Sequence, residues 1–432
     1  MLKPIMEYSS KIEQLFLSYE EKDKRRVITF TFQVTDDCCL RCTYCYELNK
    51  QHNYMTKEKG EEIIDFILSE AKKEESILSY EKNIGIIIDF IGGEPFMNID
   101  LVSHVIEYFE KRLIEENSPC LFFHRYNFSS NGVLYWDDKV QKLIRDYGDL
   151  MSVGITVDGY KELHDECRVF PDGKGSYDLA ISAALDQLNN YNNGSTKITL
   201  CPENIDKTFI AIVNMLNLGF KRIQGNCVFE EGWTEKEAKI LYEQMKKIAD
   251  YLLQNDLEDK CYISLFSETD FIPLEDSDNQ NWCGGTGKMI SVDHNGVFYP
   301  CIRYMPLSLP KDVPAFSVGS LEKGLYETKE DKDKYNFLTS ITRKSQSTEE
   351  CITCPIAKGC AWCSGYNYSK FGTPNKRATY ICVMHKARAL GNYYFWKNEA
   401  IKKHKENKVK LNLQKEEAIK IIGEEEYNKL VG

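Results

Sequence analysis

The sequence predicts an α/β protein in which an open barrel of six β/α units is followed by a cysteine-rich region. Two observations predict this architecture. First, β-rich runs alternate with amphipathic helical runs from residue 26 to residue 254, and such alternation builds a parallel sheet with helices outside it. Second, most of the 16 cysteines gather in two groups, one early in this region and one beyond it. Six units are too few for a closed eight-fold barrel, so a partial (β/α)6, TIM-like barrel is expected.

The first unit begins with the β-rich run at residues 26–35, and Thr56 caps the amphipathic helix that follows it through Lys73. Five more strand–helix pairs follow, at residues 85–91 and 100–114, 121–129 and 137–146, 150–157 and 176–188, 197–201 and 205–218, and 222–229 and 234–254. Residues 263–266 can add another strand. The active site of a parallel barrel lies at the carboxyl ends of its strands. Functional residues are therefore expected in the loops that leave the strands.

The composition excludes several classes of function. The 432-residue chain is 42% hydrophobic and 28% charged, as in ordinary globular proteins. Its formal charge of −11 argues against binding nucleic acid through phosphate contacts and is compatible with a basic peptide partner. Residues 1–19 lack the pattern of a signal peptide, and no apolar run reaches the length of a membrane span. We therefore expect a cytoplasmic protein with no nucleic-acid or membrane partner.

Four cysteines crowd into the loop after the first strand, where the active site is expected. Thiols in a reducing compartment need a reason other than disulfides. Cys39, Cys42 and Cys45 have ferredoxin-like spacing, but the fourth Cys followed by Pro that this pattern needs is missing. Cys38, Cys42 and Cys45 form C-x3-C-x2-C, whose three thiolates leave one iron of a cubane cluster open. Zinc is the alternative, although it generally takes four ligands.

This spacing resembles that of the radical S-adenosylmethionine (SAM) enzymes, whose signature is C-x3-C-x2-C with an aromatic residue before the last Cys. Tyr44 occupies the aromatic position. The resemblance implies that Cys38, Cys42 and Cys45 hold a [4Fe–4S] cluster whose open iron is chelated by SAM. It also implies that Tyr44 lies against the adenine, while Cys39 is a bystander that packs inward.

The loops after the second and third strands resemble further motifs of the same family. Gly92, Gly93 and Glu94 match its GGEP motif, which contacts the SAM amino group. Glycines let the backbone approach a ligand closely, and Glu94 can accept hydrogen bonds from an ammonium. A plain strand-ending turn is the alternative interpretation. Ser130 and Asn131 follow the third strand, as the family's TNG segment does.

The loop after the fourth strand resembles the family's S-x-DG…HD…R run, with Thr156 in place of the common Ser. In the family, that hydroxyl and a nearby Arg can bind the SAM carboxylate. Thr156 and Arg168 are therefore the candidates for this contact. His164 is expected to be structural, and no catalytic side chain is predicted.

The second group of cysteines resembles the SPASM extension of radical SAM enzymes, which carries two auxiliary [4Fe–4S] clusters. The pattern is C-x12-G-x4-C, then C-x2-C-x5-C-x2-C, then a last Cys; the family usually has x3 where this chain has its final x2. Zinc ribbons are the alternative, although seven cysteines divide awkwardly into tetrahedral sites. A substrate thiolate or a distant Cys261 could complete the first auxiliary cluster. The implied ligands are Cys283, Cys301 and Cys363 for the first cluster and Cys351, Cys354, Cys360 and Cys382 for the second.

The resemblance also implies a reaction. Reduction of the first cluster cleaves SAM, and the resulting 5′-deoxyadenosyl radical removes hydrogen from a substrate carbon, with the auxiliary clusters able to accept the remaining electron. SPASM proteins mostly modify peptides or proteins. Sulfatase-maturing members carry an Asp, which acts as a base, and a Gln where this chain has Ile302 and Ile91. Because loss of a catalytic base is not a conservative change, these two positions argue against sulfatase maturation.

We therefore expect a peptide maturase that installs a cross-link in a ribosomally made precursor peptide. A Cys thioether is favoured over a carbon–carbon bond. The first alternative is an anaerobic sulfatase-maturing, formylglycine-forming enzyme. The second is an iron–sulfur or zinc protein that only transfers electrons or binds a partner.

The predicted domains are an N-terminal arm (1–25), the radical SAM barrel (26–266), the auxiliary-cluster domain (267–390) and a helical tail (391–432). About 25 residues precede the first strand, which is too few for a leader-binding domain of about 80 residues. The leader is thus expected to bind a separate protein, or else the barrel mouth and the SPASM region. The other expected partners are a Cys-containing precursor peptide and a reductant such as flavodoxin or ferredoxin.

Overall fold

The structure is a computed structural model that describes residues 26–281 and 283–432. The predicted N-terminal arm, residues 1–25, lies outside the described residues. The chain divides into two compact units. Of the described residues, the first unit contains 26–41, 45–155 and 283–340, and the second contains 42–44, 156–281 and 341–432.

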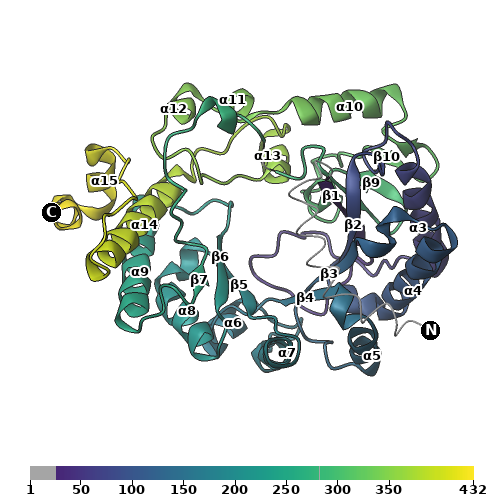
Figure 1. Cartoon of the computed structure of the whole chain (residues 1–432), viewed down its shortest axis with the longest axis horizontal. Coiled ribbons are helices and arrows are strands. Elements are labelled where there is room, and N and C mark those ends of the chain that lie inside the picture. The colour runs from purple at the N-terminus through teal and green to yellow at the C-terminus, as the bar shows by residue number, and fades with distance from the viewer. Residues whose placement is uncertain (1–25, 282) are drawn as a thin grey trace. The chain divides into compact units, whose positions relative to one another are not determined.

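The first unit is built on an eight-stranded sheet with the order β11-β10-β9-β8-β1-β2-β3-β4 (Figure 1). Its strands β1 to β4 run parallel and match the first four predicted strands. Thr56 caps the first helix as predicted, because its side chain accepts the N–H of Lys59. The parallel strands and the helices after the first three are β1 (Arg26–Gln33), α3 (Lys57–Ala71), β2 (Asn83–Ile91), α4 (Ile99–Glu115), β3 (His124–Ser130), α5 (Asp138–Tyr147) and β4 (Met151–Ile155).

Part of the predicted cysteine-rich region extends this sheet, which the sequence analysis did not predict. Strand β8 (Met289–Val292) pairs parallel with β1, and three short strands continue antiparallel from it. These are β9 (Val297–Tyr299), β10 (Gly319–Ser320) and β11 (Gly324–Leu325), followed by α10 (Lys329–Ser340).

One face of the sheet forms the hydrophobic core of the first unit. Phe30 and Phe90, like the other aromatic residues at alternate positions of β1 to β3, are almost completely buried. Phe66 of α3 stacks on Phe298 of β9, and Phe109 of α4 meets Tyr126 of β3 edge-on. The helices thus cover this face, and burial of these rings is the main source of its stability.

The opposite face of the same strands is polar. Because successive side chains of a strand point to opposite faces, the residues between the aromatic ones share this inner face. The strand register aligns five polar residues across neighbouring strands. In order across the sheet, they are Ser291, Thr31, Asp89, Asn127 and Ser152.

The second unit contains the remaining strand–helix units. Its three strands are parallel, in the order β5-β6-β7, and an isolated parallel bridge joins Thr156, just after β4, to Lys197 of β5. Six strand–helix units therefore follow in the predicted order, and the predicted α/β fold is confirmed. Their elements are α6 (Lys161–Cys167), α7 (Tyr177–Asn190), β5 (Ser195–Leu200), α8 (Thr208–Asn217), β6 (Arg222–Cys227), α9 (Glu235–Gln254) and β7 (Tyr262–Ile263).

The C-terminal part of the second unit is helical, as predicted for the tail. Helix α14 packs on α9 and continues across the predicted boundary at residue 391. Glu426 anchors the last helix to α9 through Lys246 and Tyr242. The helices are α11 (Arg343–Gln346), α12 (Glu349–Ile352), α13 (Ser364–Phe371), α14 (Cys382–Lys402), α15 (Lys415–Ile422) and α16 (Glu424–Val431). Short 3-10 helices η1 to η6 occupy Pro95–Asn98, Pro119–Phe122, Gly148–Leu150, Pro202–Lys207, Asp276–Asp278 and Ile302–Tyr304.

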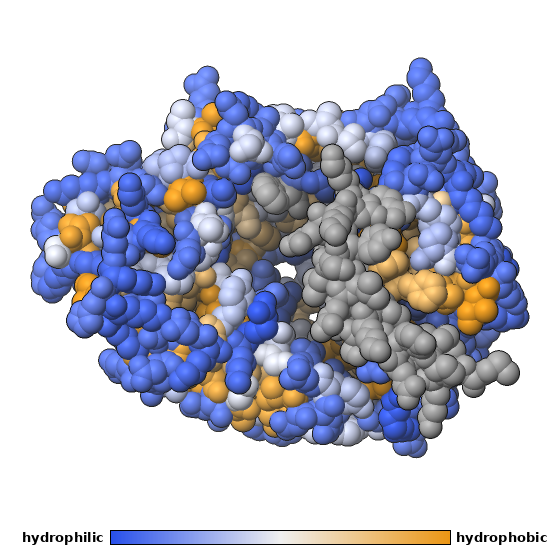
Figure 2. Space-filling model, in the orientation of Figure 1, coloured by the Kyte–Doolittle hydropathy of each residue, from blue (hydrophilic) through white to orange (hydrophobic). Residues whose placement is uncertain are grey.

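The visible surface is mostly hydrophilic, with hydrophobic residues in small separate patches (Figure 2). In the described parts of the chain, no helix combines the length and the apolar character that crossing a bilayer requires.

Candidate active site

The loop that carries the first cysteines begins with a rigid turn around Asp37. The Asp37 carboxylate accepts hydrogen bonds from the N–H of Cys38 (2.8 Å), the Tyr54 hydroxyl (2.7 Å) and a ring nitrogen of His52 (2.6 Å). Burial opposes ionisation of Asp37, but the bonds from Tyr54 and His52 outweigh it and lower its pKa. Thr35 in turn accepts the N–H of Asp37 at 3.0 Å. The start of the loop is therefore fixed before the first thiol.

Cys38 is buried and surrounded by N–H donors. Its Sγ accepts the N–H of Leu40 at 3.4 Å and the side-chain amide of Asn131 at 3.7 Å. The same amide lies 3.3 Å from Sγ of the half-buried Cys39. The neighbouring Cys39 thiol, together with burial, raises the pKa of the Cys38 thiol. Such donors suit a sulfur that carries negative charge, as a metal-bound cysteine does.

Cys45 has a cationic partner. Lys50 Nζ lies 2.9 Å from Cys45 Sγ and also donates to the carbonyl of Glu47. Burial raises the pKa of Cys45, and Lys50 acts in the opposite direction. Cys42 is half-buried and falls in the second unit with Tyr44. The loop thus offers thiolate ligands together with the charge that stabilises them.

Glu94 holds the ends of β2 and β3 together. Its side chain is 1% exposed, and Oε1 accepts the Ser130 hydroxyl at 2.8 Å and the Phe96 N–H at 3.2 Å. Oε2 accepts the N–H of Asn131 at 2.8 Å. Glu94, Ser130 and Asn131, all predicted site residues, therefore form one hydrogen-bonded cluster.

Gly92 and Gly93 make close contacts that no other residue could make. A Cβ on Gly92 would collide with the carbonyl of Thr35, and one on Gly93 would collide with the carbonyl of Asp37. The main-chain N–H of Gly93 also donates to the Thr35 carbonyl at 3.1 Å. The structure thus gives these glycines a reason that the sequence analysis did not supply, namely close packing against the cysteine loop.

Tyr44 is anchored by its hydroxyl within the second unit. The hydroxyl donates to the Asp158 carboxylate and accepts a 2.9 Å hydrogen bond from Arg168 Nη1. The N–H of Thr199 donates to Asp158 Oδ1 at 2.9 Å. Burial raises the pKa of Asp158, although the Arg168 guanidinium opposes this. Asp158 is the Asp of the S-x-DG run at residues 156–159, for which the sequence predicted no separate role.

Arg168 retains an unused donor. It is 7% exposed, and its Nε has no hydrogen-bond partner in the described part of the chain. A buried, unpartnered guanidinium N–H suits an anionic ligand group. This observation fits the carboxylate of SAM, which the family resemblance assigns to Arg168 and Thr156. Thr156 is half-buried at the end of β4.

His164 has a structural environment, as expected. It is fully buried, its Nδ1 accepts the N–H of Asp158 at 3.2 Å, and its Nε2 lies 3.0 Å from the Ser176 hydroxyl. Burial lowers its pKa to about 3, helped by Arg168. A neutral His164 thus holds the Asp158 loop in place.

The cysteines of the second group are distributed over both units. Cys283 and Cys301 lie in the first unit, and Cys363 lies in the second, where it caps α13 by accepting the N–H of Tyr366. The other four, Cys351, Cys354, Cys360 and Cys382, belong to the second unit and are close enough for their charges to influence one another. Thr348 donates to Cys351 Sγ at 3.3 Å. Within residues 26–281 and 283–432, no three Cys, His, Asp or Glu side chains converge as a ready metal site.

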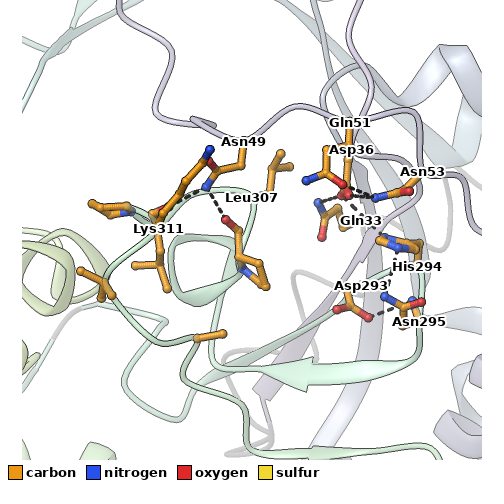
Figure 3. Close-up of a pocket in the computed structure, with 15 residues that line it drawn as sticks. Gln33, Asp36, Asn49, Gln51, Asn53, Asp293, His294, Asn295, Leu307 and Lys311 are labelled. Carbon is orange, nitrogen blue, oxygen red and sulfur yellow. Dashed lines mark hydrogen bonds and ion pairs between the residues drawn. The ribbon is translucent and has the colours of Figure 1, made fainter.

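A cavity of about 410 Å³ opens beside the cysteine loop in the first unit. Figure 3 shows Gln33, Asp36, Asn53 and His294 gathered together, with Asp36 accepting amide N–H groups from Gln33 (2.6 Å) and Asn53 (2.8 Å). Leu307 and the segment around it add an apolar lining. The other residues that line the cavity are Asn49, Gln51, Asp293, Asn295, Pro306, Leu309, Pro310, Lys311, Val313 and Ala315.

Comparison with known proteins identifies the class. Residues 32–216 match the Radical SAM superfamily, and this stretch contains the cysteine loop, Glu94, Asn131, Thr156 and Arg168. The chain is a radical SAM enzyme, and a radical SAM domain implies bound SAM and a [4Fe–4S] cluster.

The relatives narrow the class to the SPASM type that the cysteine pattern predicted. A cysteine-type anaerobic sulfatase-maturating enzyme of Clostridium novyi is 23% identical over 76% of this chain and 85% of its own length. The subtilosin biosynthesis protein AlbA of Bacillus subtilis is 23% identical over 80% of this chain and 69% of its own. An uncharacterized protein of Methanocaldococcus jannaschii is 29% identical over 33% of this chain, which spans 43% of that protein's length.

Solved structures share the fold. Native anSMEcpe with bound AdoMet superimposes with a TM-score of 0.63 at 18% identity, covering 87% of this chain and 98% of that one. Streptococcus suis SuiB bound to its precursor peptide SuiA superimposes with a TM-score of 0.54 at 15% identity, covering 82% of this chain and 76% of that one. These similarities support the partial-barrel architecture.

Proposed function

We propose that this chain is a peptide maturase that removes hydrogen from a ribosomally made precursor peptide and installs a cross-link, namely a Cys thioether. The observation that supports this most strongly is the order of groups at successive strand ends. The cysteine loop follows β1, Glu94 follows β2, Asn131 follows β3 and Thr156 follows β4. These positions are the carboxyl ends of parallel strands, where β/α barrels place their active sites.

In this proposal Cys38, Cys42 and Cys45 hold the radical-generating cluster, and SAM lies among Tyr44, Gly92, Gly93, Glu94, Ser130, Asn131, Thr156 and Arg168. When bound, the cluster and SAM together supply the hydrogen-abstracting radical. Lys50 offsets the negative charge of Cys45, and Asn131 donates toward Cys38. In the first unit, the Glu94 carboxylate offers negative charge to an ammonium group, and in the second unit the unpartnered Nε of Arg168 offers an N–H to a carboxylate.

A thioether requires the substrate to lose one C–H and one S–H bond and to gain one C–S bond. The carbon loses a hydrogen atom, the thiol loses a proton, and one electron must leave for an acceptor. Auxiliary clusters would supply that acceptor; the residues that would hold them are Cys283, Cys301 and Cys363 for one and Cys351, Cys354, Cys360 and Cys382 for the other. The product peptide is therefore lighter by two hydrogens and retains all of its sulfur.

The cavity beside the cysteine loop supports a peptide substrate. Its lining combines side-chain amides, which can pair with a peptide backbone, with apolar residues such as Leu307 and Val313. Lys311 adds an exposed positive charge at the rim. We propose that an extended segment of the precursor binds there. A flavodoxin or ferredoxin is the proposed electron donor, and a separate leader-binding protein would assist recognition.

A second candidate is formation of formylglycine on a sulfatase. The Clostridium novyi relative is named a sulfatase-maturating enzyme, and its similarity covers 76% of this chain. The two reactions differ in the fate of sulfur. Thioether formation keeps the sulfur and removes two hydrogens, whereas oxidation of a target Cys to formylglycine removes the sulfur.

The test begins with the reconstituted protein under anaerobic conditions with dithionite and SAM. Formation of 5′-deoxyadenosine is expected, and it should disappear in Cys38→Ala, Cys42→Ala and Cys45→Ala but persist in Cys39→Ala. Synthetic Cys-containing peptides are then incubated with the enzyme and weighed by mass spectrometry. Loss of two hydrogens with sulfur retained supports the maturase, and loss of sulfur supports the second candidate. Absence of 5′-deoxyadenosine from the iron-loaded protein would contradict both.

A further inference from the structure

Two buried arginines without acidic partners contact the chain segment that ends at Cys360 in the second unit. Arg343 of α11 is 5% exposed and Arg377 is 6% exposed. Neither guanidinium forms an ion pair with an Asp or Glu anywhere in residues 26–281 and 283–432. Buried cations are costly unless an opposite charge offsets them. Their surroundings should therefore contain an anion that carboxylates do not provide.

The arginines are held in place by carbonyl groups of the cysteine segment. Arg377 Nη2 donates to the carbonyl of Cys360 at 2.6 Å, and its Nη1 lies 3.4 Å from the Ser347 hydroxyl. Arg343 Nη2 donates to the carbonyl of Ala357, while its Nε has no hydrogen-bond partner in the described residues. Both cations thus contact the 354–360 segment directly.

Further hydrogen bonds join α11, which carries Arg343, to the segment that carries Arg377. The N–H of Arg377 donates to the carbonyl of Gln346, the last residue of α11, at 3.2 Å. The Gln346 side chain donates to the carbonyl of Pro374 at 2.6 Å. Burial and the nearby Arg377 guanidinium together lower the pKa of Arg343. Holding two repelling buried cations together needs a strong compensating charge.

Cysteines of the same segment are the candidates for that charge. Arg377 donates directly to the main-chain carbonyl of Cys360, and Arg343 donates to the carbonyl of Ala357, three residues before that cysteine. Lys386, which follows Cys382 by one turn of α14, is already paired with Glu417. The one carboxylate that influences Arg343 is that of Asp278, which lies 3.6 Å from Lys358 and is thus already shared.

We propose that Arg343 and Arg377 are the counter-cations of the auxiliary cluster on Cys351, Cys354, Cys360 and Cys382, and that they raise its reduction potential. The inference rests on the proposed function, which includes this cluster. A [4Fe–4S] cluster with four thiolates carries a double negative charge in its oxidised state, which two guanidinium groups neutralise. One-electron reduction by an external donor adds a third negative charge. Two nearby fixed cations stabilise that reduced state more than the oxidised one, and net charge is a known determinant of cluster potential.

The test is a redox titration of the full chain with Cys38, Cys42 and Cys45 replaced by Ala, which leaves only auxiliary clusters. Dithionite with mediators supplies the electrons, and electron paramagnetic resonance follows the signal. The signal of interest is the one lost in Cys351→Ala and Cys354→Ala. Arg343→Gln and Arg377→Gln should each lower the reduction equilibrium constant at least tenfold, a shift of 59 mV to more negative potential for one electron.

Matched variants separate charge from structure. Lys344→Gln removes the same charge from the neighbouring exposed position of α11, and it should shift the potential by less than half as much because solvent screens it. Arg343→Lys and Arg377→Lys keep the charge and should keep most of the potential. If the Arg→Gln variants lose iron while the Arg→Lys variants retain it, that result also supports the proposal, because the cluster then requires the positive charge at these positions.

Three results would overturn the inference. An unchanged midpoint potential in both Arg→Gln variants would overturn it while leaving the cluster intact. Loss of iron in the Gln and Lys variants alike would give the arginines a purely structural role. Unchanged iron content after replacing Cys351, Cys354, Cys360 and Cys382 by Ala would mean that no cluster binds there. That last result alone would also refute the proposed auxiliary cluster.

Discussion

Oε2 of Glu94 accepts a 2.8 Å hydrogen bond from the main-chain N–H of Asn131, so one carboxylate links the loops after β2 and β3. The same carboxylate accepts Ser130 and Phe96 through Oε1. The Asn131 side chain, positioned in this way, donates toward Cys38 and Cys39. Glu94 therefore influences the cysteine loop without touching a thiol.

Replacing Glu94 by Gln should lower the free energy of unfolding by about 2 kcal/mol. A Gln amide has one acceptor oxygen, so one of the buried donors now served by Glu94 would lose its partner or face another N–H. Urea denaturation measures the effect. Glu62→Gln, at an exposed site on α3, should change stability by less than about 0.5 kcal/mol. Equal effects in the two variants would contradict a buried clamp.

Gly93→Ala should destabilise the cysteine loop by about 3 kcal/mol, because the new Cβ would collide with the Asp37 carbonyl and the Cys38 side chain. The variant is expected to bind less iron after reconstitution, and iron analysis with thermal unfolding measures both effects. Gly154→Ala on β4 is the control, since its Cβ would find its nearest neighbour at 3.4 Å. A Gly93→Ala protein with normal iron content and stability would show that the backbone contact is not needed.

Tyr44→Phe should reduce stability by about 2 kcal/mol while keeping the aromatic ring. The lost hydroxyl leaves the buried Asp158 and Arg168 groups without a hydrogen bond that each now has. Tyr44→Ala should in addition weaken SAM binding, measured by equilibrium dialysis, at least tenfold more than Tyr44→Phe does. Tyr160→Phe in the same unit should be nearly neutral. If Phe and Ala weaken SAM binding equally, the ring does not contact the adenine.

Asp89→Asn should stabilise the protein at neutral pH. Burial raises the pKa of Asp89 to about 6, although Thr31 donates a hydrogen bond to it. The unfolded pKa is about 3.9, so the folded carboxyl ionises with more difficulty. Stability is therefore unaffected below about pH 4, decreases as the pH rises toward about 6, and stays reduced above that.

The expected gain from Asp89→Asn is at most about 3 kcal/mol at pH 7.5 and much smaller at pH 4.5. Chemical denaturation at the two pH values measures it. Asp149→Asn, at an exposed position, should show no such pH dependence. A gain of equal size at both pH values would mean that ionisation of Asp89 is not its cause.

Lys311→Glu and Gln51→Ala, both at exposed positions of the cavity wall, should raise the KM for the peptide found by the mass assay at least threefold. SAM cleavage without peptide should stay unchanged, because neither residue belongs to the proposed SAM site. Lys329→Glu on α10 is the charge-matched control. A drop in peptide-free SAM cleavage would instead indicate that the cavity communicates with the cluster site.

The main elements of the fold were predictable because their signals are local. Strand and helix periodicity located six units, and Thr56 marked the start of α3 as its predicted cap. The pairing of β8 with β1 was not predictable in this way. It joins residues about 260 positions apart, and no local pattern encodes such a partner.

The sequence predicts a set of site residues but not the contacts that these residues make. The glycines of residues 92–93 were expected to approach a ligand, yet they pack on the backbone of Thr35 and Asp37. Lys50 gives no signal of its own, since a lone Lys is usually a solvated side chain, and Asp158 belongs to the S-x-DG run without a predicted role. Their roles arise only when folding places them beside Tyr44 and Cys45.

Strand β2 keeps its one aromatic ring, that of Phe90, on the helix-covered face and its hydrogen-bonding group, Asp89, on the other. Redesign of the polar face can exploit this separation. A combinatorial library at Thr31, Asp89, Asn127 and Ser152 would change the polar face of the sheet and leave the aromatic residues of the core in place. Laboratory evolution of this enzyme can therefore begin there with little risk to folding.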